Sequence, residues 1–183
     1  MSKLYGRSPL KNLNIFKNKL FYIAIIIVLV CILFITIYPV WKHVFITSSM
    51  VKEIIIKYED SQFIIDPSSQ DGQKILEKVN DILPQVVQVR MVFVGKEIYE
   101  ARNSSSYIEV ILNKKYEFNI YDDRVNTDKL IIFVFGKYEH IITLFGGMDS
   151  HNREIWNCYS IYSRHPSFLE LKNLVKDLAK VYR

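Results

Sequence analysis

The chain has 183 residues, 50% of them hydrophobic, and its 24 Lys and Arg residues outnumber its 19 Asp and Glu residues by five. That excess comes from five basic residues in the first 19 positions, which contain no acidic residue: Lys3, Arg7, Lys11, Lys17 and Lys19. The rest of the chain has equal numbers of basic and acidic residues. This argues against a nucleic-acid-binding domain, because such a domain needs a basic surface. Only Cys158 lies beyond residue 41, so that part cannot form an internal disulfide and must be held together by packing.

Residues 20–41 form an uncharged, apolar run. A helix rises about 1.5 Å per residue and the hydrocarbon core is about 30 Å thick, so the run predicts a transmembrane helix. It is longer than the apolar region of a secretory signal and has no small-residue cleavage site after it, which predicts that it is retained. Its ends are marked by Leu20, Phe21 and interfacial aromatic residues: Tyr22, Tyr38 and Trp41.

The charges around the run predict its orientation. Short basic flanks stay on the cytoplasmic side, so the N-terminus is expected inside and the large domain outside. The predicted organisation is a cytoplasmic tail (1–19), a transmembrane helix (20–41), a juxtamembrane linker (42–50) and an extracytoplasmic domain (51–183). The lipid bilayer is therefore the first predicted partner.

The domain opens with two short apolar stretches, 53–58 and 63–65, which predict strands on either side of a turn. Residues 66–69 offer N-cap side chains. Helical spacing then predicts one apolar face, ended by Pro84; its members are Ile75, Leu76, Val79, Ile82 and Leu83.

The middle of the domain is rich in predicted strands. Residues 86–94 predict a strand followed by a turn at Gly95-Lys96 and a polar loop at 103–106. Residues 107–112 and 116–121 flank Asn113-Lys114-Lys115, which predicts a hairpin, and residues 122–128 are turn-like.

A second predicted hairpin joins residues 130–135 and 138–145 through Gly136-Lys137, a pair that suits a type II′ turn. The apolar runs on both sides predict burial on both faces. Residues 146–150 break the pattern, and residues 155–162 predict one more strand.

Ser167 and Glu170 match a capping box at the start of a C-terminal helix. Its apolar stripe predicts a helix that packs on the sheet: Phe168, Leu171, Leu174, Val175, Leu178 and Val181. The predicted fold is thus α+β, a mostly antiparallel sheet packed by two helices.

The order of these elements resembles small extracytoplasmic domains of unknown function from low-GC Gram-positive bacteria, which are attached to the membrane by a lipid or an N-terminal helix. The matching stretches are residues 53–56, 63–66 leading to 75–82, 107–120, 128–145 and 167–175. The resemblance implies fold and compartment and brings no catalytic residues. Leu29 and Val30 precede Cys31 where lipoproteins of this kind have small residues, so this chain departs from them.

Chemical motifs are scarce. Asp149, His151, Glu154 and Cys158 are close in sequence but lack the spacing of a zinc site. Cys158 could pair with His140 only if the fold brings them together. No glycine motif for phosphate binding is present, so no metal and no cofactor is predicted.

The sequence therefore favours a non-enzymatic binding or accessory module at the cell envelope, with a protein partner there and no nucleic acid. Two alternatives stay open. One is an envelope-acting enzyme that uses residues 149–165, from Asp149 to His165. The other is a small subunit of a larger membrane complex.

Overall fold

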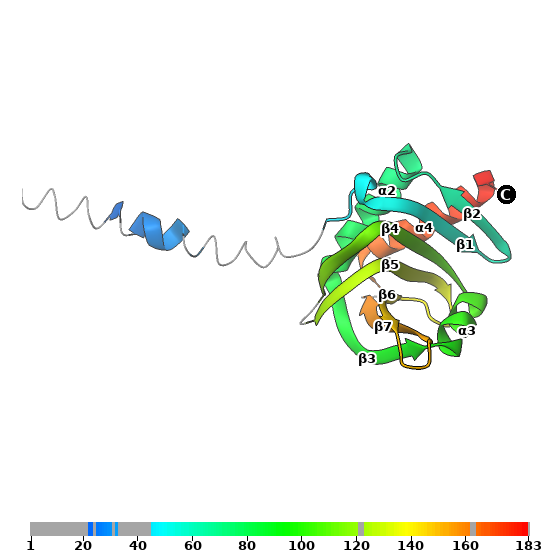
Figure 1. Cartoon of the computed structure of the whole chain (residues 1–183). Coiled ribbons are helices and arrows are strands. Elements are labelled where there is room, and N and C mark those ends of the chain that lie inside the picture. The colour runs from blue at the N-terminus through cyan, green and yellow to red at the C-terminus, as the bar shows by residue number, and fades with distance from the viewer. Residues whose placement is uncertain are drawn as a thin grey trace, which may run out of the picture. The chain divides into compact units, whose positions relative to one another are not determined.

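The computed structural model describes residues 22, 23, 25–30, 32, 45–120, 123–161 and 164–182. The chain divides into two compact units, residues 1–42 and 43–183 (Figure 1). The described residues of the first unit are helical, and their large apolar side chains are exposed. No helix within the described residues is long and apolar enough to cross a membrane. The remaining predicted anchor and topology residues lie outside the described residues: Leu20, Phe21, Tyr38, Trp41, Lys3, Arg7, Lys11, Lys17 and Lys19.

The second unit is an α+β domain on a seven-stranded antiparallel sheet of order β2-β1-β4-β5-β6-β7-β3. The elements follow in the order η2 (Ser48–Met50), β1 (Val51–Tyr58), β2 (Ser61–Ile65), α2 (Gln70–Ile82), η3 (Leu83–Gln85), β3 (Val86–Val94), α3 (Lys96–Ser104), β4 (Ser105–Ile120), β5 (Asp123–Gly136), β6 (Ile141–Met148), β7 (Glu154–Ile161) and α4 (Pro166–Tyr182). The predicted α+β class and antiparallel sheet are confirmed.

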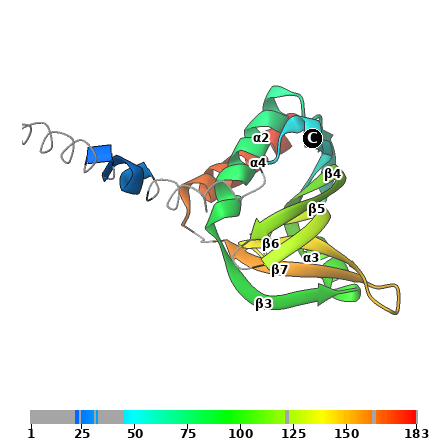
Figure 2. The same cartoon turned by 60° about the vertical axis from the view of Figure 1, so that its left-hand side comes forward.

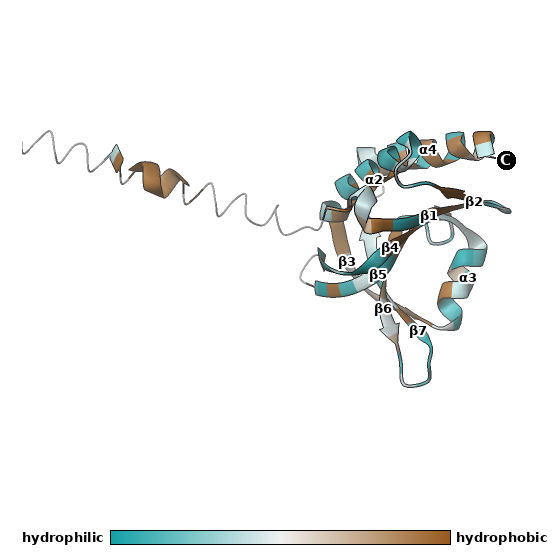
Figure 3. Ribbon diagram, turned by 45° about the horizontal axis from the view of Figure 1, so that its top comes forward, coloured by the Kyte–Doolittle hydropathy of each residue, from teal (hydrophilic) through white to brown (hydrophobic). Residues whose placement is uncertain are grey.

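Helices α2 and α4 lie side by side on one face of the sheet (Figure 2). Successive strand residues point to opposite faces, so alternate residues such as Ile108 and Val110 meet these helices. Both helices have hydrophobic and hydrophilic sides (Figure 3). The Ser69 side chain caps α2 by accepting a hydrogen bond from Gly72 N (3.0 Å), as the sequence predicts. The buried face of α4 consists of Phe168, Leu171, Val175, Leu178 and Ala179.

The opposite face of the sheet, which we call the second face, packs against α3. The sheet curls, and α3 joins the end of edge strand β3 to the start of β4 (Figure 1). A smaller core fills this region: Phe93, Ile98, Ala101, Tyr107, Ile131, Phe133, Trp156 and Cys158. Residues 131–134 of β5 are all buried because both faces are covered there, which confirms the predicted two-sided burial.

Helix α3 is absent from the sequence prediction, which placed a turn at Gly95-Lys96 and a loop at 103–106. Gly95 has a φ of 55°, a conformation that favours glycine, and the helix starts directly after it. Only Ile98 and Ala101 of α3 are buried, too few to produce a helical period in the sequence.

The predicted hairpin around residues 113–115 is wrong. Strand β4 continues through these residues, and its register with β5 shifts from Ile111↔Lys129 to Tyr116↔Thr127. The polar residues 113–115, whose composition is typical of a turn, form a β-bulge within the strand. The predicted turn at 122–128 is also wrong from residue 123 on, because β5 begins at Asp123. Here Val125 and Thr127 are buried in alternation with exposed Arg124 and Asn126.

Three local predictions need correction: a turn, a helix cap and one residue of the apolar stripe of α4. The β5–β6 connection comprises residues 137–140 in place of a two-residue turn, and His140 N donates to Phe133 O (3.1 Å). The capping box is wrong: α4 begins at Pro166, and Glu170 pairs with Lys78 Nζ at 2.8 Å. Val181 is 76% exposed, so it does not belong to the buried stripe.

Candidate functional site

A row of cross-strand neighbours runs over the second face from β1 to β3. Its register follows from the antiparallel pairing: Ile55, Glu109, Ile131, Thr143, Cys158 and Met91. Two members carry polar groups into an apolar interior, Glu109 and Thr143. Glu109 is 7% exposed and Thr143 is fully buried, and among the described residues the Thr143 hydroxyl has no hydrogen-bond partner. Buried polar groups are rare in a hydrophobic core, so these side chains single out this part of the sheet as a candidate site.

Glu109 forms a partly buried ion pair with Arg102 of α3. Arg102 Nη2 lies 2.7 Å from Glu109 Oε1, and the two side chains are 22% and 10% exposed. Burial raises the pKa of Glu109, while Arg102 and Lys129 oppose that rise. Buried pairs of this kind add little net stability to a fold, so stability alone does not explain the presence of this one.

The position of Arg102 depends on how α3 ends. Lys57 Nζ, from β1, donates to Arg102 O (2.6 Å) and Asn103 O (3.3 Å). A cation at the C-terminus of a helix satisfies the last carbonyls and complements the helix dipole. Lys57 therefore fixes the end of α3 above the sheet and, with it, the backbone of Arg102.

Aromatic rings extend the ion pair across the face. The Arg102 guanidinium lies 5.3 Å from the Trp156 ring centroid, and Trp156 Nε1 donates to Glu154 Oε2 (3.0 Å). The rings of Trp156 and Phe145 lie 5.3 Å apart, and Lys129 Nζ lies 5.4 Å from the Phe145 ring. The two adjacent rings thus lie between two cations, an arrangement stabilised by cation–π attraction.

Beyond these buried groups the second face reaches solvent. Five neighbouring residues on β1, β4, β5 and β6 are only partly buried, and we call them the open face: Glu53, Ile55, Ile111, Lys129 and Phe145. It combines three apolar side chains with one charge of each sign. Such a surface can bind an extended or amphipathic ligand through apolar contact and can orient it through the two charges.

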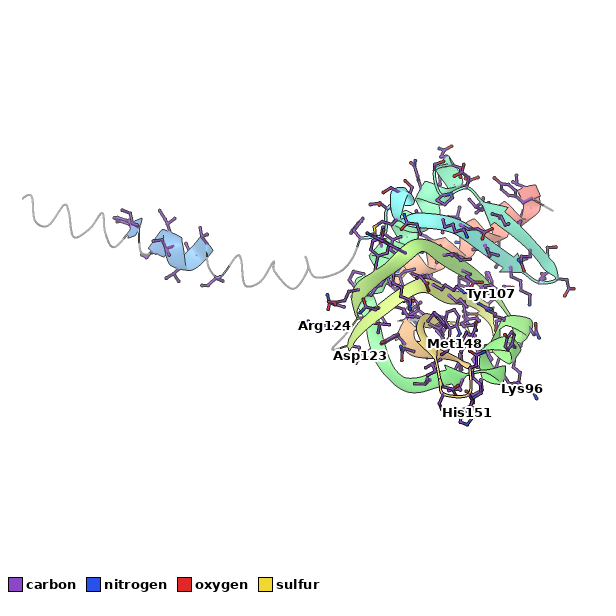
Figure 4. All side chains as sticks on the ribbon, in the orientation of Figure 1. Lys96, Tyr107, Asp123, Arg124, Met148 and His151 are labelled. Carbon is purple, nitrogen blue, oxygen red and sulfur yellow. The ribbon has the colours of Figure 1, made fainter. Side chains whose placement is uncertain are left out.

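The residues of the enzyme alternative are held in a turn. Asp149 Oδ1 accepts hydrogen bonds from the backbone N–H groups of His151 (2.9 Å) and Arg153 (2.8 Å), and Oδ2 accepts two from the Arg153 guanidinium. These bonds lower the pKa of Asp149. His151 is exposed at the tip of the β6–β7 connection (Figure 4). Asp149 therefore shapes the turn.

Cys158 and His140 are not brought together. Cys158 lies in the smaller core, where burial raises the pKa of its thiol to about 12. His140 lies in the β5–β6 turn, and its ring packs 4.9 Å from that of Phe168 in the larger core, on the opposite face. Burial lowers the pKa of His140. A neutral thiol separated from the imidazole by the sheet is not a nucleophile–base pair.

His165 lies just before α4, and its buried Nδ1 atom has no hydrogen-bond partner in the described part of the chain. Across the described residues, no group of three or more His, Cys, Asp or Glu side chains is placed to hold a metal ion. Comparison of the chain with family models, curated proteins and solved structures finds no match. The resemblance to Gram-positive extracytoplasmic domains stays a prediction.

The sequence reading missed Arg102 and Glu109. Glu109 did leave a signal, because it is a charged residue within the apolar segment 107–112. Arg102 left none, since its role depends on where α3 lies in the fold.

Proposed function

We propose that this chain is a single-pass membrane protein whose extracytoplasmic domain is a non-enzymatic binding module at the cell envelope. The observation that supports the binding role best is the open face next to the Arg102–Glu109 pair. Large apolar side chains that stay partly exposed beside fixed charges are typical of protein-binding surfaces.

The buried pair strengthens this argument. Replacing such a pair by apolar residues of similar size is often neutral or stabilising, so packing alone does not require it. The Arg102–Glu109 pair lies between Trp156 and the open face, where it can also order a binding surface. It holds charge and ring orientation fixed where a partner would bind, which reduces the ordering that binding requires.

The anchored topology is supported by the sequence. The uncharged run, the basic residues before it and the neutral domain after it favour a cytoplasmic N-terminus and an external C-terminal domain. Those residues of the run that the structure describes are helical and expose apolar side chains, as a lipid-facing helix would.

Topology can be tested with protease added to intact cells stripped of their wall. Digestion should remove the domain that follows residue 43. A C-terminal tag that remains fully protected would contradict the proposed orientation.

Binding can be tested with a photo-crosslinking amino acid placed at Ile111 on the open face and, as a control, at Lys96, whose side chain is 88% exposed on α3. We expect a crosslinked partner from position 111 only. Equal crosslinking from both positions, or none from position 111 in cells that express the protein, would contradict the proposed surface. A partner that remains stoichiometric through detergent purification would favour the subunit alternative.

A further inference from the structure

The bulge in β4 exposes two neighbouring lysines. Residues 113–115 lie between the last pair before the register shift, Ile111↔Lys129, and the first pair after it, Tyr116↔Thr127. All three are exposed, and Lys114 Nζ lies 5.2 Å from the Tyr116 ring. The Tyr116 hydroxyl donates to Asn113 Oδ1 (2.9 Å), which orders the bulge from within. Bulges commonly re-aim side chains for a function.

The bulge is joined to the start of the domain. Asn113 Nδ2 donates to Ser49 O (2.8 Å), in the segment that leads into β1. Asn80 of α2 holds the same segment by two further bonds: Ile46 N donates to Asn80 Oδ1 and Asn80 Nδ2 donates to Ile46 O, both at 2.8 Å. Residues 46–49 are therefore fixed to the domain, with the lysines beside them.

Chain connectivity then limits how far the start of the domain can be from the end of the apolar run. Only residues 42–44 separate Trp41, the last residue of the apolar run, from Phe45. Four peptide steps span at most about 14 Å, whatever the arrangement of the two units. Phe45 is itself 68% exposed, an apolar side chain at the start of the domain.

We propose that Lys114 and Lys115 bind the anionic phosphate headgroups of the membrane that anchors the chain. This inference rests on the membrane anchorage proposed above. A lysine close to an anionic membrane surface strengthens attraction roughly fivefold, so two of them favour the bound arrangement by on the order of 25-fold. Tethering supplies a high local concentration of headgroups, so the weak attraction suffices.

The test uses the full chain reconstituted in phosphatidylcholine vesicles with or without phosphatidylglycerol. A donor dye is attached at Asn126→Cys, an exposed position that pairs with Glu117 just beyond the bulge, in a Cys31→Ser background. Energy transfer to an acceptor dye on lipid headgroups should rise when phosphatidylglycerol is present. It should return to the phosphatidylcholine value in the Lys114→Glu/Lys115→Glu variant.

The matched control is Lys96→Glu/Lys137→Glu, which changes the net charge equally at two exposed lysines; Figure 4 shows Lys96 far from the β4–β5 end marked by Arg124. This variant should keep the rise. High salt should abolish it in the parent chain, because the Debye length falls to about 3 Å at 1 M.

Transfer that is equal in the two lipid mixtures, or lost equally in both charge variants, overturns the headgroup inference and leaves the anchorage intact. A chain that washes off the vesicles in alkaline carbonate refutes the anchorage and this inference together.

Discussion

Replacing Arg102 by methionine tests whether the buried ion pair stands as described. Two unit charges about 4 Å apart attract by about 4 kcal/mol at an effective dielectric constant of 20. Removing Arg102 leaves Glu109, which is 7% exposed, buried without its ion-pair partner. We therefore expect Arg102→Met to lower the free energy of unfolding by about 3–5 kcal/mol, a large part of the roughly 5–15 kcal/mol of a small domain.

The stability lost in Arg102→Met should become smaller as the pH falls. Burial raises the pKa of Glu109, so the folded protein holds that proton more tightly than the unfolded chain does. Without Arg102 this pKa rises further. Protonation then removes the buried charge, and the stability lost at pH 7 should be regained as the pH falls toward the ordinary carboxyl range.

Urea unfolding of residues 45–183 at pH 7 and at mildly acidic pH measures both effects. The control is Lys180→Met, which removes a surface pair of similar length, Lys180–Asp177 at 2.8 Å with both side chains at least 70% exposed. Exposed pairs contribute little, so this variant should unfold like the parent. An Arg102→Met variant that also unfolds like the parent, or whose loss grows on acidification, would refute the reasoning.

Three further outcomes are expected. Leu171→Ala, at a fully buried position of α4, should cost about 2–5 kcal/mol in the same urea assay, whereas Val181→Ala, at a position 76% exposed, should change little; equal effects would mean that α4 does not pack as described. Asn80→Ala should cost about 1–3 kcal/mol and speed proteolysis near Ile46, because both backbone groups of Ile46 lose their partner; unchanged cleavage would contradict the clamp. The Cys158 thiol, with its pKa raised to about 12, should resist alkylation at pH 8 until the protein is unfolded, and fast labelling of the folded protein would show that it is accessible.

Sequence periodicity predicted those elements whose burial is regular. Residues 75–83 repeat at helical spacing, and α2 buries that face. The apolar run at 130–135 predicted a strand covered on both sides, and residues 131–134 of β5 are all buried. In each case the hydrophobic pattern and the packing have the same period, so the pattern alone is sufficient.

The predictions failed where polar residues are held by tertiary contacts. Asn113-Lys114-Lys115 has the composition of a turn, yet its strand neighbours hold it in β4 as a bulge. Residues 123–128 look turn-like by composition, although Val125 and Thr127 alternate with exposed residues as a strand requires. The candidate site was hardest to predict, because Arg102 and Glu109 meet only after α3 has folded back over the sheet.

The two-bond clamp of Asn80 on Ile46 also has a mechanical consequence. Any force transmitted through the N-terminal part of the chain reaches the domain at Phe45 and meets this clamp first. Both bonds close on one residue, so they share the load and must break together. Behind them β1 is hydrogen-bonded on both sides, to β2 and to β4, and resists being peeled from the sheet. The N-terminal end of the domain is thus held first by the Asn80–Ile46 hydrogen bonds and then by the pairing of β1. Tension on the chain would free the segment around Ser49 before it disturbed the sheet.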